Sequence, residues 1–170
     1  MNRIKILKGD IAKITVDAIV NAANSYLLGG GGVDGAIHKA AGRKLLKECR
    51  KLGGCETGKA KITQGYNLPA KFIIHTVGPI YDSGKQGESE LLASCYCESL
   101  KLAAENGIKT IAFPCISTGV YGYPFCEACV IALRTIEEFL KANDSITQIY
   151  MVCYSDSDFE RFKAILKDFA

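Results

Sequence analysis

Asp34 follows a run of four glycines, Gly29 to Gly32, and stands at the start of a segment with helical apolar spacing. Glycines between a strand and a helix let backbone N–H groups crowd around an anion, and the helix N-terminus adds its positive end. Side chains at these positions would block a phosphate from the backbone. The pattern predicts a phosphate cradle, and a merely flexible loop is the alternative.

A carboxylate beside a phosphate cradle raises the local electrostatic cost, so Asp34 is unusual there unless it faces another part of the ligand. One interpretation of Asp34 is a general base or a group that orients water. The other is an N-cap for a helix that begins near Gly35, because Asp is a favoured capping residue. Both interpretations stay open on the residues alone.

Two common nucleotide motifs do not account for the glycine run. Gly30, Gly32 and Gly35 satisfy G-x-G-x-x-G, but the dinucleotide motif needs its glycines directly after the strand, and NSYLLG intervenes here. A P-loop needs Gly-Lys-Ser/Thr at the start of the helix, where this chain has Val33-Asp34-Gly35. Hydrolysis of nucleoside triphosphates is therefore not expected.

A second loop, PCISTGVYGYP from Pro114 to Pro124, again follows an apolar run and precedes a helical pattern. It combines hydroxyl groups, glycines and two tyrosines, so it could supply further N–H donors while Tyr121 or Tyr123 covers a ribose or a base. Two such loops at the ends of different strands suggest a pyrophosphate held between them, and a plain turn is the alternative for the second loop.

The elements that must position these loops alternate between strand-like and helix-like periods, which is typical of an α/β domain with a buried sheet. Predicted strands are IKILK (4–8), DAIVNAA (17–23), AKITQG (60–65), KFIIHTV (71–77), TIAFP (110–114) and QIYMVCY (148–154). Predicted helices are residues 35–51, 88–106, 124–142 and 157–169.

Composition predicts one domain over residues 1–170, since this length suffices to bury a core. The net charge of +3 is too mild to indicate specific DNA binding or a membrane surface, and no run approaches the length of a membrane span. The start of the chain shows no signal-peptide pattern, so we expect a cytoplasmic protein whose eight cysteines are reduced thiols.

Five stretches of the chain together resemble the macrodomain family, specifically its MacroD-type hydrolase branch. They are GDI (9–11), DAIVNAAN (17–24), LLGGGGVDGAIHKAAG (27–42), HTVGP (75–79) and PCISTGVYGYP (114–124). Their order and spacing match over nearly the whole chain. The resemblance implies a three-layer α/β/α fold around a central mixed sheet, whereas periodicity alone indicates only α/β.

The resemblance also implies an ADP-ribose site, with Asp10 accepting the adenine amino group and Ile11 beside it. Tyr154 stands where the family often stacks an aromatic ring on adenine, and an ordinary exposed tyrosine is the alternative. The implied ligand-binding residues are Asp10, Ile11, Asn24, Gly30, Gly31, Gly32, Val33, Ser117, Thr118, Gly119, Val120, Tyr121 and Tyr154.

The activity implied by the resemblance is hydrolysis of esters on the distal ribose, with ADP-ribose released. Substrates would be O-acetyl-ADP-ribose and proteins mono-ADP-ribosylated on Glu or Asp. Asn24 and Asp34 would hold a water against the ester, without a cofactor or metal, and either Asp34 or the substrate phosphate would be the base. A non-catalytic ADP-ribose reader is the alternative, although a pure binder has no need for a carboxylate near the ribose.

The residues raise two further chemistries. Cys95-x-Cys97 and Cys126-x-x-Cys129 have zinc-like spacing, but both lie in predicted amphipathic helices, where Cys behaves as a small apolar residue. A Ser-His hydrolase using Ser117 lacks the G-x-S-x-G elbow. We expect His75 to be a hydrogen-bonded sheet histidine and His38 to lie near Asp34 without contacting the ligand.

Overall fold

The six-stranded sheet has the order β1-β6-β5-β2-β4-β3 in a computed structural model that describes residues 2–170. Its strands are β1 (Ile4–Lys8), β2 (Ala18–Ala23), β3 (Ala60–Gln64), β4 (Phe72–Val77), β5 (Thr110–Phe113) and β6 (Gln148–Cys153). Neighbouring strands run parallel except for β3, which pairs antiparallel with β4, so the sheet is mixed. Each predicted strand is present, with its ends shifted by at most one residue.

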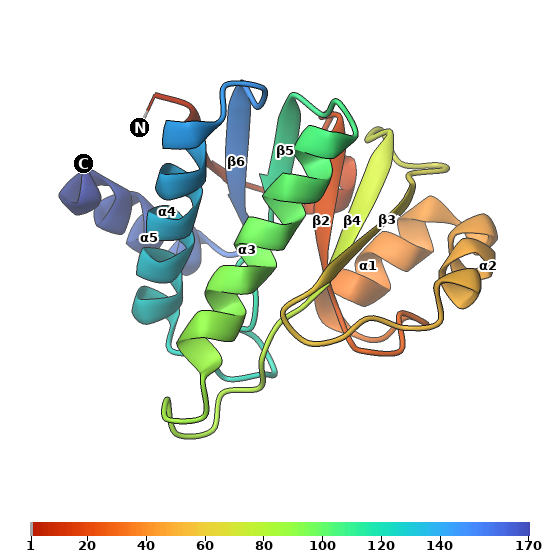
Figure 1. The fold of residues 1–170 in the computed structure, drawn as a ribbon, viewed down its shortest axis with the longest axis horizontal. Helices are drawn as coiled ribbons and strands as arrows, with labels where there is room; N and C mark the ends of the chain where they lie inside the picture. The colour runs from red at the N-terminus through yellow and green to blue at the C-terminus, as the bar shows by residue number, and fades with distance from the viewer. Residues whose placement is uncertain (1) are drawn as a thin grey trace.

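Helices cover both faces of the sheet, as Figure 1 shows. They are α1 (Gly32–Ala41), α2 (Arg43–Leu52), α3 (Glu88–Glu105), α4 (Phe125–Ala142) and α5 (Asp156–Phe169), with a 3-10 turn at Ile11–Lys13. Apolar residues of α3, α4 and α5 form one core with the sheet, and those of α1, α2 and the 3-10 turn form the other. The three-layer α/β/α prediction is confirmed.

The prediction of one helix over residues 35–51 is wrong, because two helices meet at Gly42. Gly42 has φ of 89° and ends α1 by donating its N–H to the His38 carbonyl oxygen at 3.1 Å. That backbone conformation strains any residue with a Cβ, so glycine ends one helix and allows the next to begin at Arg43. The first helix also starts earlier than predicted, at Gly32.

The parallel strands bring their carboxyl ends to one edge of the sheet, where ligand sites of open α/β sheets occur. The glycine loop leaves the end of β2, and the 114–124 loop leaves the end of β5, which pairs directly with β2. The sheet therefore places the two loops next to each other, although about 90 residues separate them along the chain.

Candidate functional site

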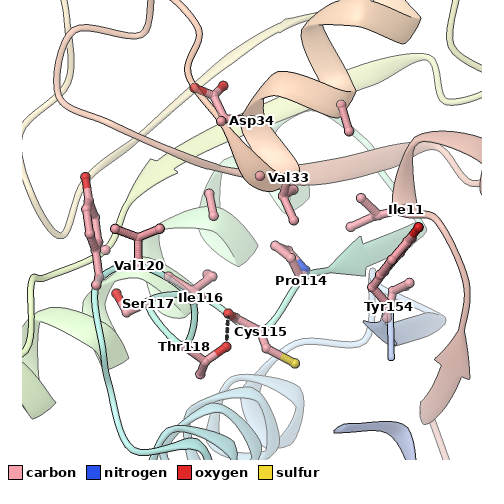
Figure 2. A pocket seen from close by; sticks show the side chains of 18 of the residues that line it. Ile11, Val33, Asp34, Pro114, Cys115, Ile116, Ser117, Thr118, Val120 and Tyr154 are labelled. Carbon is pink, nitrogen blue, oxygen red and sulfur yellow. Dashed lines mark hydrogen bonds between the residues drawn. The ribbon is translucent and has the colours of Figure 1, made fainter. Parts of the chain in front are cut away.

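A cavity of about 790 Å³ lies between the two loops at this edge of the sheet. Figure 2 shows Asp34 on one side and the segment from Pro114 to Thr118 on the other. Every residue that the sequence predicts for the ligand site lines it: Asp10, Ile11, Asn24, Gly30, Gly31, Gly32, Val33, Asp34, Ser117, Thr118, Gly119, Val120, Tyr121 and Tyr154. The fold thus collects four separate segments into one site.

Close backbone contacts hold the glycine loop in place. A Cβ at Gly35 would collide with the carbonyl oxygen of Gly30, so the first turn of α1 packs directly against the loop. Leu27 is fully buried with φ of 60°, and its N–H donates to the Asn24 carbonyl oxygen at 3.2 Å. The loop is therefore anchored on both sides of the glycine run.

Asp34 is not the N-cap of α1, because the cap position is Gly31 and Asp34 is the third residue of the helix. Asp34 is 4% exposed, and its carboxylate stands in the first turn, where the positive end of the helix favours a negative charge. Oδ1 accepts a hydrogen bond from Asn21 Nδ2 at 2.8 Å and lies 3.3 Å from His38 Nε2. Oδ2 has no hydrogen-bond partner within the described chain.

Asn24 Nδ2 and the unpartnered oxygen of Asp34 both lie close to Gly30. An added Cβ at Gly30 would lie 3.1 Å from Asp34 Oδ2 and 3.3 Å from Asn24 Nδ2. The Asn24 side chain is itself fixed, since Nδ2 donates to the Gly29 carbonyl oxygen at 3.1 Å and Oδ1 accepts from Tyr26 N–H at 3.1 Å. A buried acceptor and an amide donor thus converge on the surface of Gly30.

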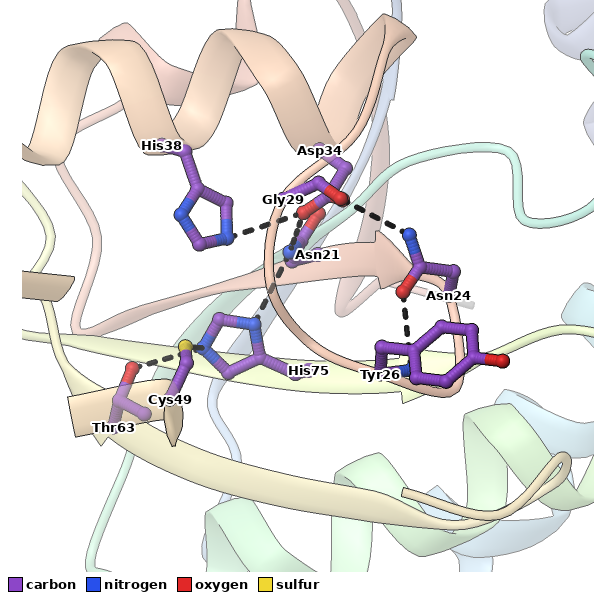
Figure 3. A network of polar contacts seen from close by, with 9 residues as sticks. All are labelled: Asn21, Asn24, Tyr26, Gly29, Asp34, His38, Cys49, Thr63 and His75. Carbon is purple, nitrogen blue, oxygen red and sulfur yellow. Dashed lines mark hydrogen bonds and ion pairs between the residues drawn. The ribbon is translucent and has the colours of Figure 1, made fainter. Parts of the chain in front are cut away.

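A buried polar chain runs behind Asp34 into the sheet (Figure 3). The Asn21 amide nitrogen donates to Asp34 Oδ1, and it lies 3.1 Å from His75 Nδ1 on the neighbouring strand. An amide nitrogen can only donate, so Nδ1 must accept and the proton of His75 sits on Nε2. Thr63 Oγ1, 2.9 Å from Nε2, then accepts a hydrogen bond from the Nε2–H and donates one to the Gln64 carbonyl oxygen.

His75 is neutral at pH 7 because burial lowers the pKa of its imidazole to about 4. The nearby His38 lowers the pKa further and Asp34 opposes it. The expectation that His75 is a hydrogen-bonded sheet histidine is confirmed. Asn21 received no role from the sequence, although a polar residue inside the apolar run IVNAA was a signal of a buried polar contact.

The second loop is shaped by Ser117, which has φ of 67°. Its hydroxyl donates to the Pro79 carbonyl oxygen at 2.8 Å and is buried, so it is a structural donor in the free protein. Gly78 permits this approach, because a Cβ there would collide with the Ser117 hydroxyl and with Ile116. Thr118 Oγ1 donates to the Cys115 carbonyl oxygen at 2.8 Å, as drawn in Figure 2.

The far end of the cavity combines Asp10 and Ile11 with Tyr154, which is 82% exposed. Asp10 Oδ1 accepts the Ala12 N–H at 2.9 Å and caps the 3-10 turn. Figure 2 shows the Ile11 and Tyr154 side chains on the same side of the cavity. This end therefore offers an apolar surface with a carboxylate beside it, which suits a heteroaromatic ring bearing an amino group.

The four cysteines with zinc-like spacing do not assemble. Cys95 and Cys129 are buried in the core, whereas Cys97 is half-buried and Cys126 is exposed. Among residues 2–170, no group of three or more His, Cys, Asp or Glu side chains is placed to hold a metal ion. Within the same residues, no helix is both long and apolar enough to span a membrane.

A mixed sheet with helices on both faces, and a cavity between the loops that follow β2 and β5, define an α/β fold of the macrodomain kind. The family model described as "Macro domain" matches residues 20–132. The chain belongs to the Macro domain family.

Relatives are similar over nearly the whole chain. "Macro domain-containing protein CT2219" from Chlorobaculum tepidum is 60% identical, with 96% of this chain and 95% of that protein covered. "ADP-ribose glycohydrolase MACROD2" from Xenopus laevis is 57% identical over 98% of this chain, which spans 40% of that longer protein. A solved glycine-to-valine mutant of the Oceanobacillus iheyensis macrodomain, "with ADPR", is 48% identical at a TM-score of 0.92, covering 96% and 91% of the two chains.

Proposed function

We propose that this chain is a hydrolase that binds ADP-ribose and cleaves esters on its distal ribose. Its substrates are O-acetyl-ADP-ribose and proteins mono-ADP-ribosylated on Glu or Asp, encountered in the cytoplasm. The observation that carries the proposal is the buried Asp34 Oδ2, which has no hydrogen-bond partner among residues 2–170 and lies, like Asn24 Nδ2, within about 3.3 Å of the position that a Cβ on Gly30 would occupy. Support from relatives comes from the name ADP-ribose glycohydrolase and from the macrodomain solved with ADPR.

In this proposal the two loops hold the pyrophosphate through backbone N–H groups. Asp10 and Ile11 receive the adenine, Tyr154 covers it, and the distal ribose lies over Gly30 to Val33 with Tyr121 on its other side. Both loops contribute donors that need no side-chain motion, so the ligand meets a preformed surface. The two ends of the cavity differ, because the end at Asp10 is largely apolar and the end at Asp34 is polar. This difference fixes the direction in which the ligand binds.

Hydrolysis adds water across the ester, giving the free ribose hydroxyl and a carboxylic acid. Asn24 Nδ2 and Asp34 Oδ2 are a donor and an acceptor, which are the two contacts needed to position a water beside the ester. One proton of that water passes to Asp34 or to a phosphate oxygen of the substrate, and the leaving ribose oxygen receives a proton. This chemistry needs neither a nucleophilic serine nor a metal.

The test compares wild type with Asp34→Ala on a glutamate-linked, auto-ADP-ribosylated protein and on O-acetyl-ADP-ribose, beside a calorimetric titration of free ADP-ribose. Asp34→Ala should lower turnover by about 10²- to 10⁴-fold if Asp34 is the only base, and by less if the substrate phosphate shares that role. ADP-ribose should still bind the variant. Asp144→Ala, an exposed aspartate away from the cavity, is the matched control.

Three results would change the proposal. Unchanged turnover by Asp34→Ala removes Asp34 from the reaction. Binding of ADP-ribose by wild type without cleavage of either ester indicates a reader module. Neither binding nor cleavage contradicts both functions.

A further inference from the structure

Two cysteines outside the proposed reaction lie side by side in the cavity wall. Cys115 Sγ and Cys153 Sγ are 3.8 Å apart, and both residues line the cavity. Figure 2 shows Cys115 across the cavity from Asp34. Neither thiol takes part in the proposed hydrolysis, and an ADP-ribose cradle does not require one.

The sheet itself brings the two cysteines together. Strands β5 and β6 are parallel, with Phe113 opposite Met151. Cys115 follows two residues later, just beyond the end of β5, and Cys153 is the last residue of β6. Adjacent strands lie about 4.8 Å apart, which falls within the Cα separation that a disulfide requires. A disulfide therefore needs only a side-chain rotation and a small approach of the two backbone segments.

The thiols are also chemically unequal. A hydrogen bond from the Cys115 thiol lowers the pKa of Cys153, although burial opposes the shift. The same hydrogen bond, together with burial, raises the pKa of Cys115. Two adjacent thiols, one of which can resolve the oxidised form of the other, are the arrangement of redox-sensing cysteines.

We propose that Cys115 and Cys153 are a redox modification site, at which hydrogen peroxide forms a reversible disulfide that weakens binding at the adenosine end of the cavity. The Cys153 thiolate attacks peroxide, giving a sulfenic acid and hydroxide. Cys115 then attacks the sulfenic sulfur, loses its proton, and expels the second oxygen as water once protonated. In total two thiols and one peroxide give one disulfide and two waters, with two electrons passing from sulfur to peroxide.

The effect on binding follows from the hydrogen bonds that the backbone carbonyl oxygens of the two cysteines accept. The Cys153 carbonyl oxygen accepts the Gly9 N–H at 2.9 Å, next to Asp10. The Cys115 carbonyl oxygen accepts the hydroxyl of Thr118 in the second loop. Drawing the sulfurs from 3.8 Å to about 2.05 Å shifts both segments relative to each other. This part of the proposal depends on the ADP-ribose site proposed above, whereas disulfide formation does not.

The experiment treats reduced wild type with hydrogen peroxide and maps cross-linked peptides by mass spectrometry. Each sample is then titrated with ADP-ribose before oxidation, after oxidation and after dithiothreitol. We expect a Cys115–Cys153 linkage and a rise in the Kd of about threefold or more that dithiothreitol reverses. Cys115→Ser and Cys153→Ser should each lose the response to peroxide, whereas Cys126→Ser, which alters an exposed cysteine on α4, should keep it.

Oxidation of other cysteines without this linkage overturns the modification site. A linkage that leaves the Kd unchanged overturns its effect on binding. If reduced wild type does not bind ADP-ribose, the proposed function fails, and the peptide map still decides whether the linkage forms.

Discussion

Asn21 Nδ2 lies 2.8 Å from Asp34 Oδ1, and this contact joins the central strand β2 to the first turn of α1. Asn21 is fully buried, and His75 holds its amide in one orientation by accepting the second hydrogen. The free oxygen of Asp34 is therefore aimed by residues that do not touch the cavity.

Asn21→Ala is expected to reduce turnover while preserving the affinity for ADP-ribose. Without the amide, Asp34 can rotate away from the water that we propose it orients, and misplacement of this kind costs on the order of 10²-fold in rate. The measurement is kcat on O-acetyl-ADP-ribose beside the Kd of ADP-ribose. Asn2→Ala, which alters an exposed asparagine, is the control. An equal loss of kcat and affinity would indicate a collapsed site instead of a misaimed carboxylate.

Gly30→Ala is expected to lower kcat more than Gly31→Ala does. The new methyl group at position 30 would stand 3.1 Å from Asp34 Oδ2 and 3.3 Å from Asn24 Nδ2, in the place proposed for water. The same methyl at Gly31 meets no atom of residues 2–170 within 4 Å apart from its chain neighbours, so Asp34 and Asn24 stay in place. Turnover at saturating substrate separates the variants, and equal kcat values would place the reacting water elsewhere.

Stability is expected to fall as the pH drops from 6.5 toward 4, because the unfolded chain protonates His75 before the folded protein does. The folded pKa is lowered, so the full stability is present above 6.5 and is lost on acidification by an amount on the order of 3 kcal/mol. Urea unfolding across this pH range, on wild type and on His75→Asn, gives the slope of the unfolding free energy against pH for each protein. The asparagine offers an acceptor to Asn21 but does not titrate.

The difference between these two slopes isolates His75, since all other titrating groups are common to both proteins. His75→Asn will be less stable overall because it replaces a fully buried ring. A slope unchanged by the substitution would show that His75 does not gain its proton on unfolding.

The sequence predicted the strands well because buried strands of this sheet are short apolar runs bounded by turn residues. It joined α1 and α2 because the apolar stripe continues past Gly42, and only the backbone angle of that glycine reveals the break. The two loops were recognisable from their glycines. Their position next to each other in space depends on the pairing of β2 with β5, and the spacing of apolar residues along the chain does not reveal which strands pair.

The polar chain behind Asp34 shows a second limit of sequence reasoning. Asn21, Thr63 and His75 come from three strands, and their contact requires the register that sets Asn21 opposite His75. Each residue alone reads as an isolated polar position in an apolar strand. The same holds for Cys115 and Cys153, whose spacing along the chain resembles no motif.

The anchored glycine loop has a thermodynamic consequence. Four consecutive glycines lose more backbone entropy than other residues when they are ordered, and here Leu27 and the contact of Gly35 with Gly30 order them in the free protein. That loss is part of the folding free energy, so a ligand that arrives later need not supply it. The loop backbone should thus be similarly ordered in the free and the ligand-bound protein, which NMR order parameters would show.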